Sequence, residues 1–493
     1  MNVKSIFFYK CTKKDPYLIV RNLVLFVKKY LRQNSIFQKF FFDLSKILNI
    51  PKDILEKRSN QILFNSYEFE KKKFNNSYNY IKIFYDFFVL TILLFGFLIN
   101  SFIYKKHKIK KFDLLCDNIY SEGDLEQHKT FTNYFNSILL IGYSDLSLKN
   151  KKLQFINIKK RILNYTDFGF KGRILLLSFA FKMLLFSLFS RVNLFSIFKQ
   201  LIYDFIKYKK FYSEYRGKYY FNYRFYDTNA LQNYIFKKNG GLKTSCFQKN
   251  ICILSLSCYV YTDIFFSLGV DQGEICRELG GEIKTIEPVG SFHMEGKWFK
   301  QKRDLSKIPN IDILIIGINV PWPRGCINKD FHNSFYNKFL PWIKKLSNEF
   351  PNKKIYYKHH NNFIGDSKES KLLLGSNINR IVDDQSINGS YGWAYKSKII
   401  LSFASTMIVE LLGNNKEAYF VDPNGINTQW YYGIKKLNKF KLNSYKDLKK
   451  IILSNSKNSK IIKKNRQFYC LDSKNTKKRI SNYLKKKDLI FIN

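Results

Sequence analysis

The sequence predicts an α/β fold with two domains, each built from parallel strands that helices connect. A chain of 493 residues is too long for one core, because single cores stop growing at roughly 250 to 300 residues. Hydrophobic residues make up 45% of the chain and aromatic residues 18%, so a large buried core is available. Short apolar runs alternate with helical patterns over 111–437, and this alternation indicates parallel strands with helical crossovers.

The first of these domains is predicted over 111–300. Its candidate strands are short runs rich in apolar and aromatic side chains, and the pair Gly240 and Gly241 closes one of its helices. We expect strands at 111–120, 137–142, 242–248, 261–269 and 283–290, and helices at 124–135, 229–241 and 271–281.

The second domain is predicted over 305–437, where the same alternation is clearer, and the Lys-rich segment 438–493 after it is predicted to be helical. Two such domains in tandem place a crevice at the carboxyl ends of their strands, where open α/β sheets bind ligands. We expect strands at 311–319, 353–360, 378–384, 398–403 and 417–423, and helices at 333–350, 387–397 and 405–415.

Two apolar segments fall outside the predicted sheets. Within the N-terminal segment 1–110, residues 83–104 precede the basic run "KKHKIKK", which favours a cytoplasmic flank. A membrane span, a helix lying on the membrane surface and a buried core helix all fit this segment. Lys182 and Arg191 interrupt the second segment, so 173–210 is predicted to be an amphipathic helical insertion that packs against the membrane or between the domains.

The chain is strongly basic, with 84 Lys and Arg residues against 38 Asp and Glu residues and a formal net charge of +46. Such a charge suits an anionic membrane surface or a phosphate-bearing ligand. Lys, Asn, Ile, Phe and Tyr are abundant together, which also indicates the codon bias of an A/T-rich genome. No nucleic-acid-binding motif is present, so nucleic acid is not an expected partner.

The eight cysteines have no C-x-x-C spacing, so reduced thiols in a cytosol are expected rather than a zinc or redox centre. The first residues contain no cleavable signal with a small-residue cleavage site, and export is not expected. We expect a cytoplasmic protein associated with the inner face of the plasma membrane, either peripherally or through a single span.

Hydroxyl side chains lie between a buried strand and a helix in "KIILSFASTMIVELLGNN" at 398–415. A strand that turns through Ser405 and Thr406 into a helix presents free backbone N–H groups and two hydroxyls at a helix N-terminus, which favours an anion such as phosphate. Ser405 could equally be an N-cap without any ligand. Glu410 lies one turn along the helix, where it can hydrogen-bond a ligand hydroxyl or face solvent.

A second polar group, Lys358, His359 and His360, ends the candidate strand at 353–360 on the side of the crevice. A lysine and a histidine there can neutralise phosphate charge. Adjacent histidines also suggest a metal site, but adjacent strand positions point to opposite faces, and no Asp, Glu or Cys has ligand spacing. A structural or solvent-facing role is the remaining alternative.

The order of these motifs resembles the carboxyl-terminal domain of GT-B fold glycosyltransferases of surface-polysaccharide biosynthesis, including the polysialyltransferase-like, capsule and CDP-glycerol transferase groups. The similar features are "KKIYYKHH", the Ser/Thr turn before a Glu-bearing helix, and "EAYFVDP". Upstream, "LKTSCFQ", "YTDIFFSLG" and "EPVGS" resemble the amino-terminal domain of the same group. The resemblance covers 110–430 and implies two Rossmann-like domains that face a central crevice.

By this resemblance, the donor is a nucleotide sugar. Ser405 and Thr406 would bind its phosphates, and Glu410 would bind hydroxyls of its ribose or hexose. Lys358 and His359 would bind its diphosphate.

The resemblance also implies that Gly317 lets the backbone approach the donor closely. The chain departs from the group's pattern at Lys249 and Asn250, where relatives have His-Gly, and at Asn361, where a proline is expected. These departures concern the acceptor side and the catalytic base.

Transfer to an acceptor requires a carboxylate or an imidazole that takes the acceptor's proton. Glu122 and Asp124 in "YSEGDLEQH" follow a strand end and are the candidate catalytic residues, with Glu126 a third acid there. Acids at a helix start can also be partners of the helix dipole. No D-x-D pair follows a strand, which favours a metal-independent mechanism with no cofactor besides the nucleotide-sugar substrate.

These features predict a glycosyltransferase that moves a sugar from a nucleotide-sugar donor to a lipid-linked or polymeric surface glycan, such as capsule or lipopolysaccharide. A polyprenyl-phosphate-linked acceptor and an anionic membrane surface are the expected partners. A CDP-glycerol-type polyol-phosphate transferase and a sugar-nucleotide epimerase on the same fold are the enzymatic alternatives. A non-catalytic protein of this fold that binds membranes or polyanions is a third.

Overall fold

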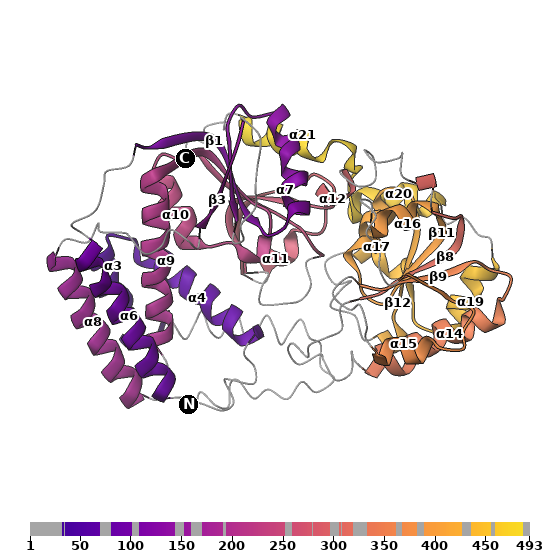
Figure 1. Ribbon diagram of the computed structural model, residues 1–493, viewed down its shortest axis with the longest axis horizontal. Coiled ribbons are helices and arrows are strands. Elements are labelled where there is room, and N and C mark those ends of the chain that lie inside the picture. Colours follow the sequence, from indigo (N-terminus) through magenta and orange to yellow (C-terminus); the bar gives the residue numbers. More distant parts are fainter. Residues whose placement is uncertain are drawn as a thin grey trace.

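The computed structural model contains two parallel sheets with their connecting helices, and a bundle of helices lies beside the first sheet (Figure 1). The structure describes residues 32–33, 35–69, 80–100, 108–142, 152–158, 170–190, 194–251, 259–278, 280–295, 305–306, 308–318, 333–360, 367–381, 389–425, 435–454 and 459–486.

The first sheet has seven parallel strands in the order β3-β2-β1-β4-β5-β6-β7. The strand order reverses between β1 and β4, because the chain builds outward to β3 and then returns to the other side of β1. Ligands of open α/β sheets bind at the carboxyl ends of strands where such a reversal occurs. The strands are β1 (Lys110–Ile119), β2 (Ile138–Gly142), β3 (Leu153–Asn157), β4 (Tyr215–Asn222), β5 (Lys243–Phe247), β6 (Tyr261–Ser267) and β7 (Glu282–Pro288). The connecting helices are α7 (Glu122–Lys129), α10 (Ala230–Lys238) and α11 (Glu274–Glu278).

The second sheet has six parallel strands in the order β10-β9-β8-β11-β12-β13, with its reversal between β8 and β11. Strands β8 and β12 of this sheet are mostly apolar and mostly buried, as is typical of parallel strands covered by helices on both faces. The strands are β8 (Ile311–Ile316), β9 (Ile355–Lys358), β10 (Asn379–Ile381), β11 (Ser397–Ser402), β12 (Glu417–Val421) and β13 (Lys441–Leu442). The helices around them are α14 (Leu340–Glu349), α15 (Ser367–Leu373), α16 (Ser390–Lys396), α17 (Thr406–Gly413) and α19 (Tyr445–Leu453).

A helical bundle lies on the side of the first sheet that is remote from the second sheet (Figure 1). Two of its helices connect β3 to β4, and the others precede β1. Its apolar side chains form one core with a face of the first sheet, and the buried ion pair between Arg58 Nε and Asp204 Oδ2 at 2.7 Å joins its helices. The helices are α3 (Ser35–Leu48), α4 (Lys52–Phe69), α6 (Tyr80–Asn100), α8 (Phe170–Ser190) and α9 (Leu194–Glu214).

The C-terminal segment connects both sheets. Helix α20 (Ser459–Tyr469) packs against α17 of the second sheet. The chain then returns to the first sheet, where α21 (Thr476–Lys485) places Tyr483 edge-on against Phe266 with ring centroids 6.2 Å apart. Both helices are yellow in Figure 1 and lie on different sheets.

The predicted α/β fold, with two Rossmann-like domains and an added apolar helical segment, is confirmed. The sequence analysis missed β3, β4 and β13, and β13 (Lys441–Leu442) lies in the segment 438–493 that was predicted to be helical. In β4 the polar run Arg216, Gly217 and Lys218 breaks the apolar pattern, although this strand is central in the sheet. The apolar segment predicted at 83–104 belongs to α6 up to Asn100, and 101–104 lie outside the described residues. Among the helices that the structure describes, none has the length and apolar content that a membrane crossing requires.

Candidate functional site

The carboxyl ends of the strands at the two reversals contain the residues that the sequence singled out. We call the ends of β8, β9 and β11 the second-sheet edge, which contains Gly317, Lys358, His359, Ser405 and Thr406. The first-sheet edge consists of the residues that follow β1, β4 and β5, among them Glu122, Asp124, Tyr223, Arg224 and Lys249.

Hydrogen bonds within the protein engage both hydroxyls of the second-sheet edge. The side chain of Ser405 accepts the backbone N–H of Met407 at 3.3 Å and is thus the N-cap of α17. Thr406 Oγ1 accepts the backbone N–H of Ile251 at 3.0 Å, in the chain that follows β5 of the first sheet. The two edges therefore meet at this turn.

Glu410 forms a second link between the sheets, because its buried carboxylate lies between two hydroxyl donors. Ser291, in the turn after β7, donates to Oε1 at 2.5 Å, and Tyr391 of α16 donates to Oε2 at 2.6 Å. A carboxylate in such a place is stabilised by hydrogen bonds to its charged form. Glu410 thus bridges the two domains within the protein itself.

His359 is held by a carboxylate that the sequence analysis missed. Its Nδ1 lies 3.1 Å from Oε2 of Glu369 in α15, and Tyr357 donates its hydroxyl to Oε1 of the same carboxylate. The His359 and Glu369 side chains are both buried. A carboxylate at Nδ1 fixes the ring so that Nε2 faces away from it. In the described part of the chain, His359 Nε2 is buried and has no hydrogen-bond partner.

Lys358 lies beside this histidine and is also buried. Its ammonium donates to the carbonyl oxygen of His359 at 3.5 Å. Burial and the charge of Lys358 lower the pKa of His360, which therefore favours its neutral form. A buried lysine next to an oriented imidazole forms a site where negative charge would be stabilised.

Gly317 ends β8 and packs tightly against β9. A Cβ atom at this position would come within 2.9 Å of the carbonyl oxygen of Lys358 and 3.1 Å of the hydroxyl of Tyr357. The neighbouring strand therefore accounts for a glycine here, because it leaves no room for a side chain.

The first-sheet edge is more highly charged. The carboxylate of Asp124 lies 3.6 Å from Lys249 Nζ and 3.8 Å from Arg224 Nη2. Burial lowers the pKa of Lys249, although Asp124 opposes this shift. Asp124 is buried and faces the two cations, whereas Glu122, two residues earlier on α7, is exposed. The structure therefore separates the two acids that the sequence proposed together.

Asp227 is a further acid of this edge that the sequence analysis missed. It lies in the short turn after β4 (Phe225–Asp227), and the residue is exposed. The protein around its carboxyl raises the pKa to about 6, with Arg224 opposing and Asp117 adding to the shift. A carboxyl with this pKa suits proton transfer near neutral pH.

A buried histidine contacts two residues of the first-sheet edge. His128 of α7 donates from Nδ1 to the carbonyl oxygen of Asp124 at 2.6 Å and meets the ring of Tyr223 edge-on, with centroids 4.7 Å apart. Burial lowers the pKa of His128 to about 4. The hydroxyl of Tyr223 in turn lies 2.9 Å from Nε2 of His293.

In the described ranges, no group of three His, Cys, Asp or Glu side chains is arranged to hold a metal ion. Four cysteines there are buried: Cys116, Cys246, Cys276 and Cys470. The other four, Cys11, Cys252, Cys258 and Cys326, lie outside the described residues.

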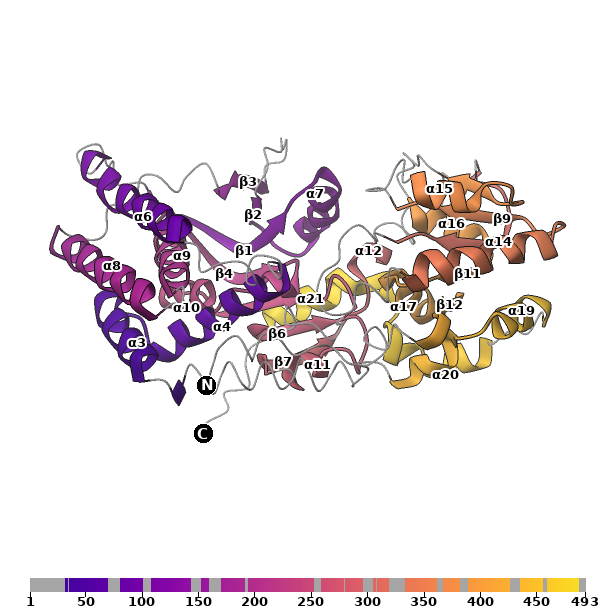
Figure 2. The same ribbon diagram turned by 90° about the horizontal axis from the view of Figure 1, so that it is seen from below.

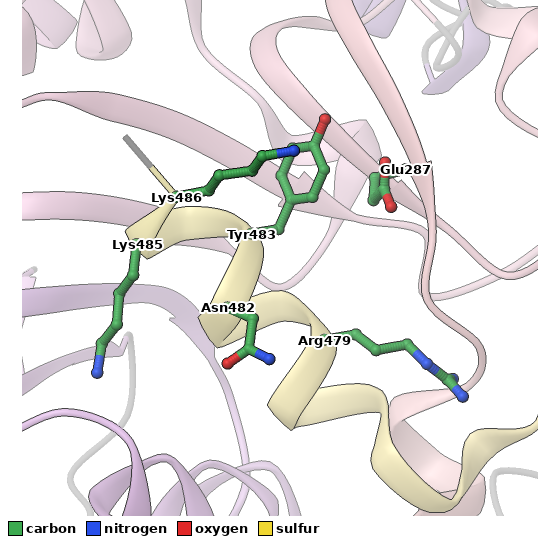
Figure 3. A pocket seen from close by; sticks show the side chains of 6 residues that line it. All are labelled: Glu287, Arg479, Asn482, Tyr483, Lys485 and Lys486. Atoms are coloured by element: carbon green, nitrogen blue, oxygen red, sulfur yellow. The ribbon is translucent and has the colours of Figure 1, made fainter. Parts of the chain in front are cut away.

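Two hollows lie away from these edges. One, of about 490 Å³, lies between β7 and α21, and Figure 3 shows its lining: Glu287, Arg479, Asn482, Tyr483, Lys485 and Lys486. Arg479 donates to the carbonyl oxygen of Val289 at 2.9 Å, so this guanidinium is already engaged. The other, of about 560 Å³, lies near the amino-terminal end of β11, where Lys416 donates to two backbone carbonyls. Neither hollow includes a residue of the two edges.

No protein-family description matches the chain, and no curated protein is similar to it in sequence. Several solved structures are similar to the chain at low identity. The UDP-GlcNAc 2-epimerase of Methanocaldococcus jannaschii is similar with a TM-score of 0.45 and 12% identity, over 76% of this chain and 100% of that one. The Neisseria meningitidis UDP-GlcNAc 2-epimerase, bound to UDP-GlcNAc, gives a TM-score of 0.42 and 12% identity, over 77% and 100%.

The wall teichoic acid polymerase TagF is similar with a TM-score of 0.45 and 10% identity, over 84% of this chain and 98% of that chain. With TM-scores below 0.5, these likenesses identify neither the substrate nor the reaction of this chain.

Proposed function

We propose that this protein is a glycosyltransferase that moves a sugar from a nucleotide-sugar donor to a lipid-linked or polymeric surface glycan at the inner face of the plasma membrane. The sequence motifs that resemble GT-B transferases of the polysialyltransferase-like and CDP-glycerol transferase-like groups support the proposal. So does the position of those motifs at the strand reversal of the second sheet, where open α/β sheets bind ligands.

The observation that carries the proposal is the buried pair of His359 and Glu369 beside Lys358. With Nδ1 held by the carboxylate at 3.1 Å, the imidazole can direct Nε2 at a phosphate oxygen. The imidazole held in this way would face the leaving diphosphate. Together, the Lys358 ammonium and this imidazole would stabilise the charge that develops on the leaving group.

On the acceptor side, the first-sheet edge offers three carboxyl groups. Glu122 and Asp124 remain candidates, but Asp124 is buried and already forms ion pairs with two cations. Asp227, with a pKa of about 6, is the stronger candidate to take the proton of an acceptor hydroxyl. Arg224 and Lys249 would stabilise an anionic acceptor such as a polyprenyl phosphate.

The test measures the melting temperature of the protein with and without each of five nucleotides: UDP, GDP, CMP, CDP and dTDP. Ligands that bind only the folded protein raise its melting temperature by mass action. We expect one nucleotide to stabilise the protein and His359→Gln to remove this shift. The matched control is His293→Gln, a histidine of the other sheet edge, which should retain it. Stabilisation by none of the five nucleotides would contradict the proposal.

Product analysis then separates the enzymatic alternatives. With the stabilising nucleotide's sugar conjugate, a transferase releases the nucleotide only when an acceptor glycan is added. An epimerase alters the sugar without an acceptor. A CDP-glycerol-type transferase uses CDP-glycerol, and none of the nucleotide sugars, as its donor. A non-catalytic binding protein would bind a nucleotide or polyanion and turn over none of these donors.

A further inference from the structure

The outer helices of the bundle expose an unusual amount of apolar surface. Nine of the fifteen exposed large apolar side chains among the described residues lie on α3, α6 and α8, although these helices contain only a small part of the chain. They are Phe42 on α3; Phe84, Tyr85, Phe88 and Ile92 on α6; and Ile174, Leu175, Phe181 and Leu185 on α8. Soluble surfaces rarely gather such side chains without a partner.

On each of the two long helices, the exposed apolar side chains follow one stripe. On α6, Phe84, Phe88 and Ile92 recur at every fourth residue, which places them within about one quarter of the helix circumference. On α8, Ile174, Phe181 and Leu185 recur at spacings of seven and four, again on one side. The opposite sides of both helices are buried in the core of the bundle.

The two stripes belong to one surface, which we call the outer face. Helices α6 and α8 pack against each other and lie side by side at the end of the molecule remote from the second sheet (Figure 2). At the seam between them, the rings of Phe87 and exposed Phe181 have centroids 6.5 Å apart. The apolar surface therefore continues from one helix to the other.

The charges around the outer face have one predominant sign. Helix α8 contains no acidic residue, and its Lys182 is exposed. The single acid of α6, Asp86, is buried and paired with Lys199 at 2.5 Å. On α3, exposed Lys46 lies over the ring of Phe42 at 4.0 Å. An apolar stripe bordered by lysines suits the interface of an anionic bilayer, where the rings enter the headgroup region and the ammonium groups meet lipid phosphates.

We propose that the outer face of α6 and α8 docks the protein on an anionic membrane surface, with the helices lying along the interface. The purpose of this contact rests on the proposed function, since it would hold the enzyme near a lipid-linked acceptor. The contact itself requires neither donor nor acceptor. It also differs from attraction by net charge alone, because it depends on particular apolar side chains.

The experiment is cosedimentation of the full chain with vesicles of equal parts phosphatidylglycerol and phosphatidylcholine, without any nucleotide. The triple variant Phe88→Ser, Leu175→Ser, Phe181→Ser removes side chains that are 62%, 56% and 52% exposed. We expect its partition onto the vesicles to fall by about tenfold or more, because the buried apolar area that drives interfacial binding is lost.

The matched control is Leu242→Ser, Leu374→Ser, Leu453→Ser, which removes three leucines of similar exposure (61%, 57% and 60%) from other parts of the chain. It should bind within about twofold of the parent, since these side chains lie outside the outer face. Unchanged melting temperatures establish that both variants fold. If the triple variant does not fold, Phe88→Ser and Leu175→Ser are measured singly.

Equal binding of the parent and the outer-face variant would overturn the inference. The inference would also be overturned if both triple variants still bound the vesicles and high salt abolished this binding. Net charge alone would then explain the attraction to the membrane. A parent that ignores vesicles but is a dimer by light scattering, with the outer-face variant a monomer, would identify a second copy as the occupant instead. A nucleotide-induced shift in melting temperature without vesicle binding would contradict only the membrane contact. Vesicle binding without such a shift would contradict only the proposed function.

Discussion

The two strand edges that meet at the domain junction hold their charged groups in different ways. At the second-sheet edge, the side chains of His359 and Glu369 are buried. The imidazole Nδ1 contacts the Glu369 carboxylate, and its Nε2 has no hydrogen-bond partner among the described residues. At the first-sheet edge, Asp124, Arg224 and Lys249 form looser ion pairs of 3.6 to 3.8 Å, and Asp227 remains accessible. A buried pair of side chains suits charge stabilisation on a leaving group, whereas a carboxyl on an exposed residue suits proton exchange with an acceptor.

The largest expected effect would sharpen this division of roles. Replacing the accessible acid by Asp227→Asn should lower the transfer rate by about 10²- to 10⁴-fold, because the acceptor loses its general base. In the parent, activity should rise with pH through the pKa of about 6, where the base loses its proton, and this limb should disappear in the variant. The measurement is a pH–rate profile of transfer.

Exposed Glu122→Gln is the matched control for Asp227→Asn, and it should keep most of the activity. A large loss in the control together with an unaffected Asp227→Asn variant would reverse the assignment of the base.

The buried histidine of the first-sheet edge makes stability depend on pH. His128 has a folded-state pKa of about 4 against an ordinary 6.5, so the unfolded chain binds a proton that the folded protein resists. The full stability is present above pH 6.5 and falls as the pH drops toward 4, by about 3 kcal/mol in total. Urea unfolding across this range measures the effect.

His128→Gln should be less stable than the parent at neutral pH and should show a smaller loss between pH 6.5 and 4. An identical pH dependence in parent and variant would assign acid sensitivity to other groups.

At the second-sheet edge, Glu369→Gln should lower transfer by about 10- to 100-fold, because an amide holds the His359 ring less firmly than the carboxylate does. Glu369 acts through the histidine and does not contact the substrate itself. The double variant with His359→Gln should be no slower than His359→Gln alone. Additive losses would mean that the two side chains act separately.

The contact between the edges can be broken by Glu410→Ala. The hydroxyls of Ser291 and Tyr391 would lose a buried acceptor, which should lower the free energy of unfolding by about 2 kcal/mol. Glu349→Ala, at an exposed ion pair, is the control and should change stability much less than Glu410→Ala does, because exposed ion pairs contribute little. A similar small change in both variants would show that Glu410 does not couple the domains.

The smallest effect distinguishes the two interpretations of Ser405. Loss of an N-cap alone in Ser405→Ala should cost about 1 kcal/mol of stability and leave nucleotide binding intact. If the hydroxyl also binds donor phosphate, the variant should in addition lose part of the nucleotide-induced shift in melting temperature. Thermal denaturation with and without the stabilising nucleotide measures both.

Local patterns predicted most strands of the second sheet because these strands are buried on both faces and appear as continuous apolar runs, as in β8 and β12. The same reasoning failed for β4, whose Arg216 and Lys218 are exposed while its neighbours are buried. The position of β4 between β1 and β5 depends on pairing with strands that lie far away in the sequence.

Local sequence patterns likewise predicted only part of the candidate site. The turn at Ser405 and the group at Lys358 were recognisable because each follows a strand end. Glu369 had no such signal, because it reaches His359 from a helix on the next crossover. The predicted roles of Ser405, Thr406 and Glu410 in donor binding stay predictions, since their side chains contact the protein itself.

The sequence by itself determined the α/β class, the two-domain organisation, and the strand ends at which polar side chains gather, because periodicity and turn chemistry are local properties. Only the tertiary structure decided which carboxylate orients His359, which acid lies between two cations, and which apolar stripes remain exposed on α6 and α8. These outcomes depend on burial and on the distances between residues remote in sequence. Both are set when the sheets and helices pack together.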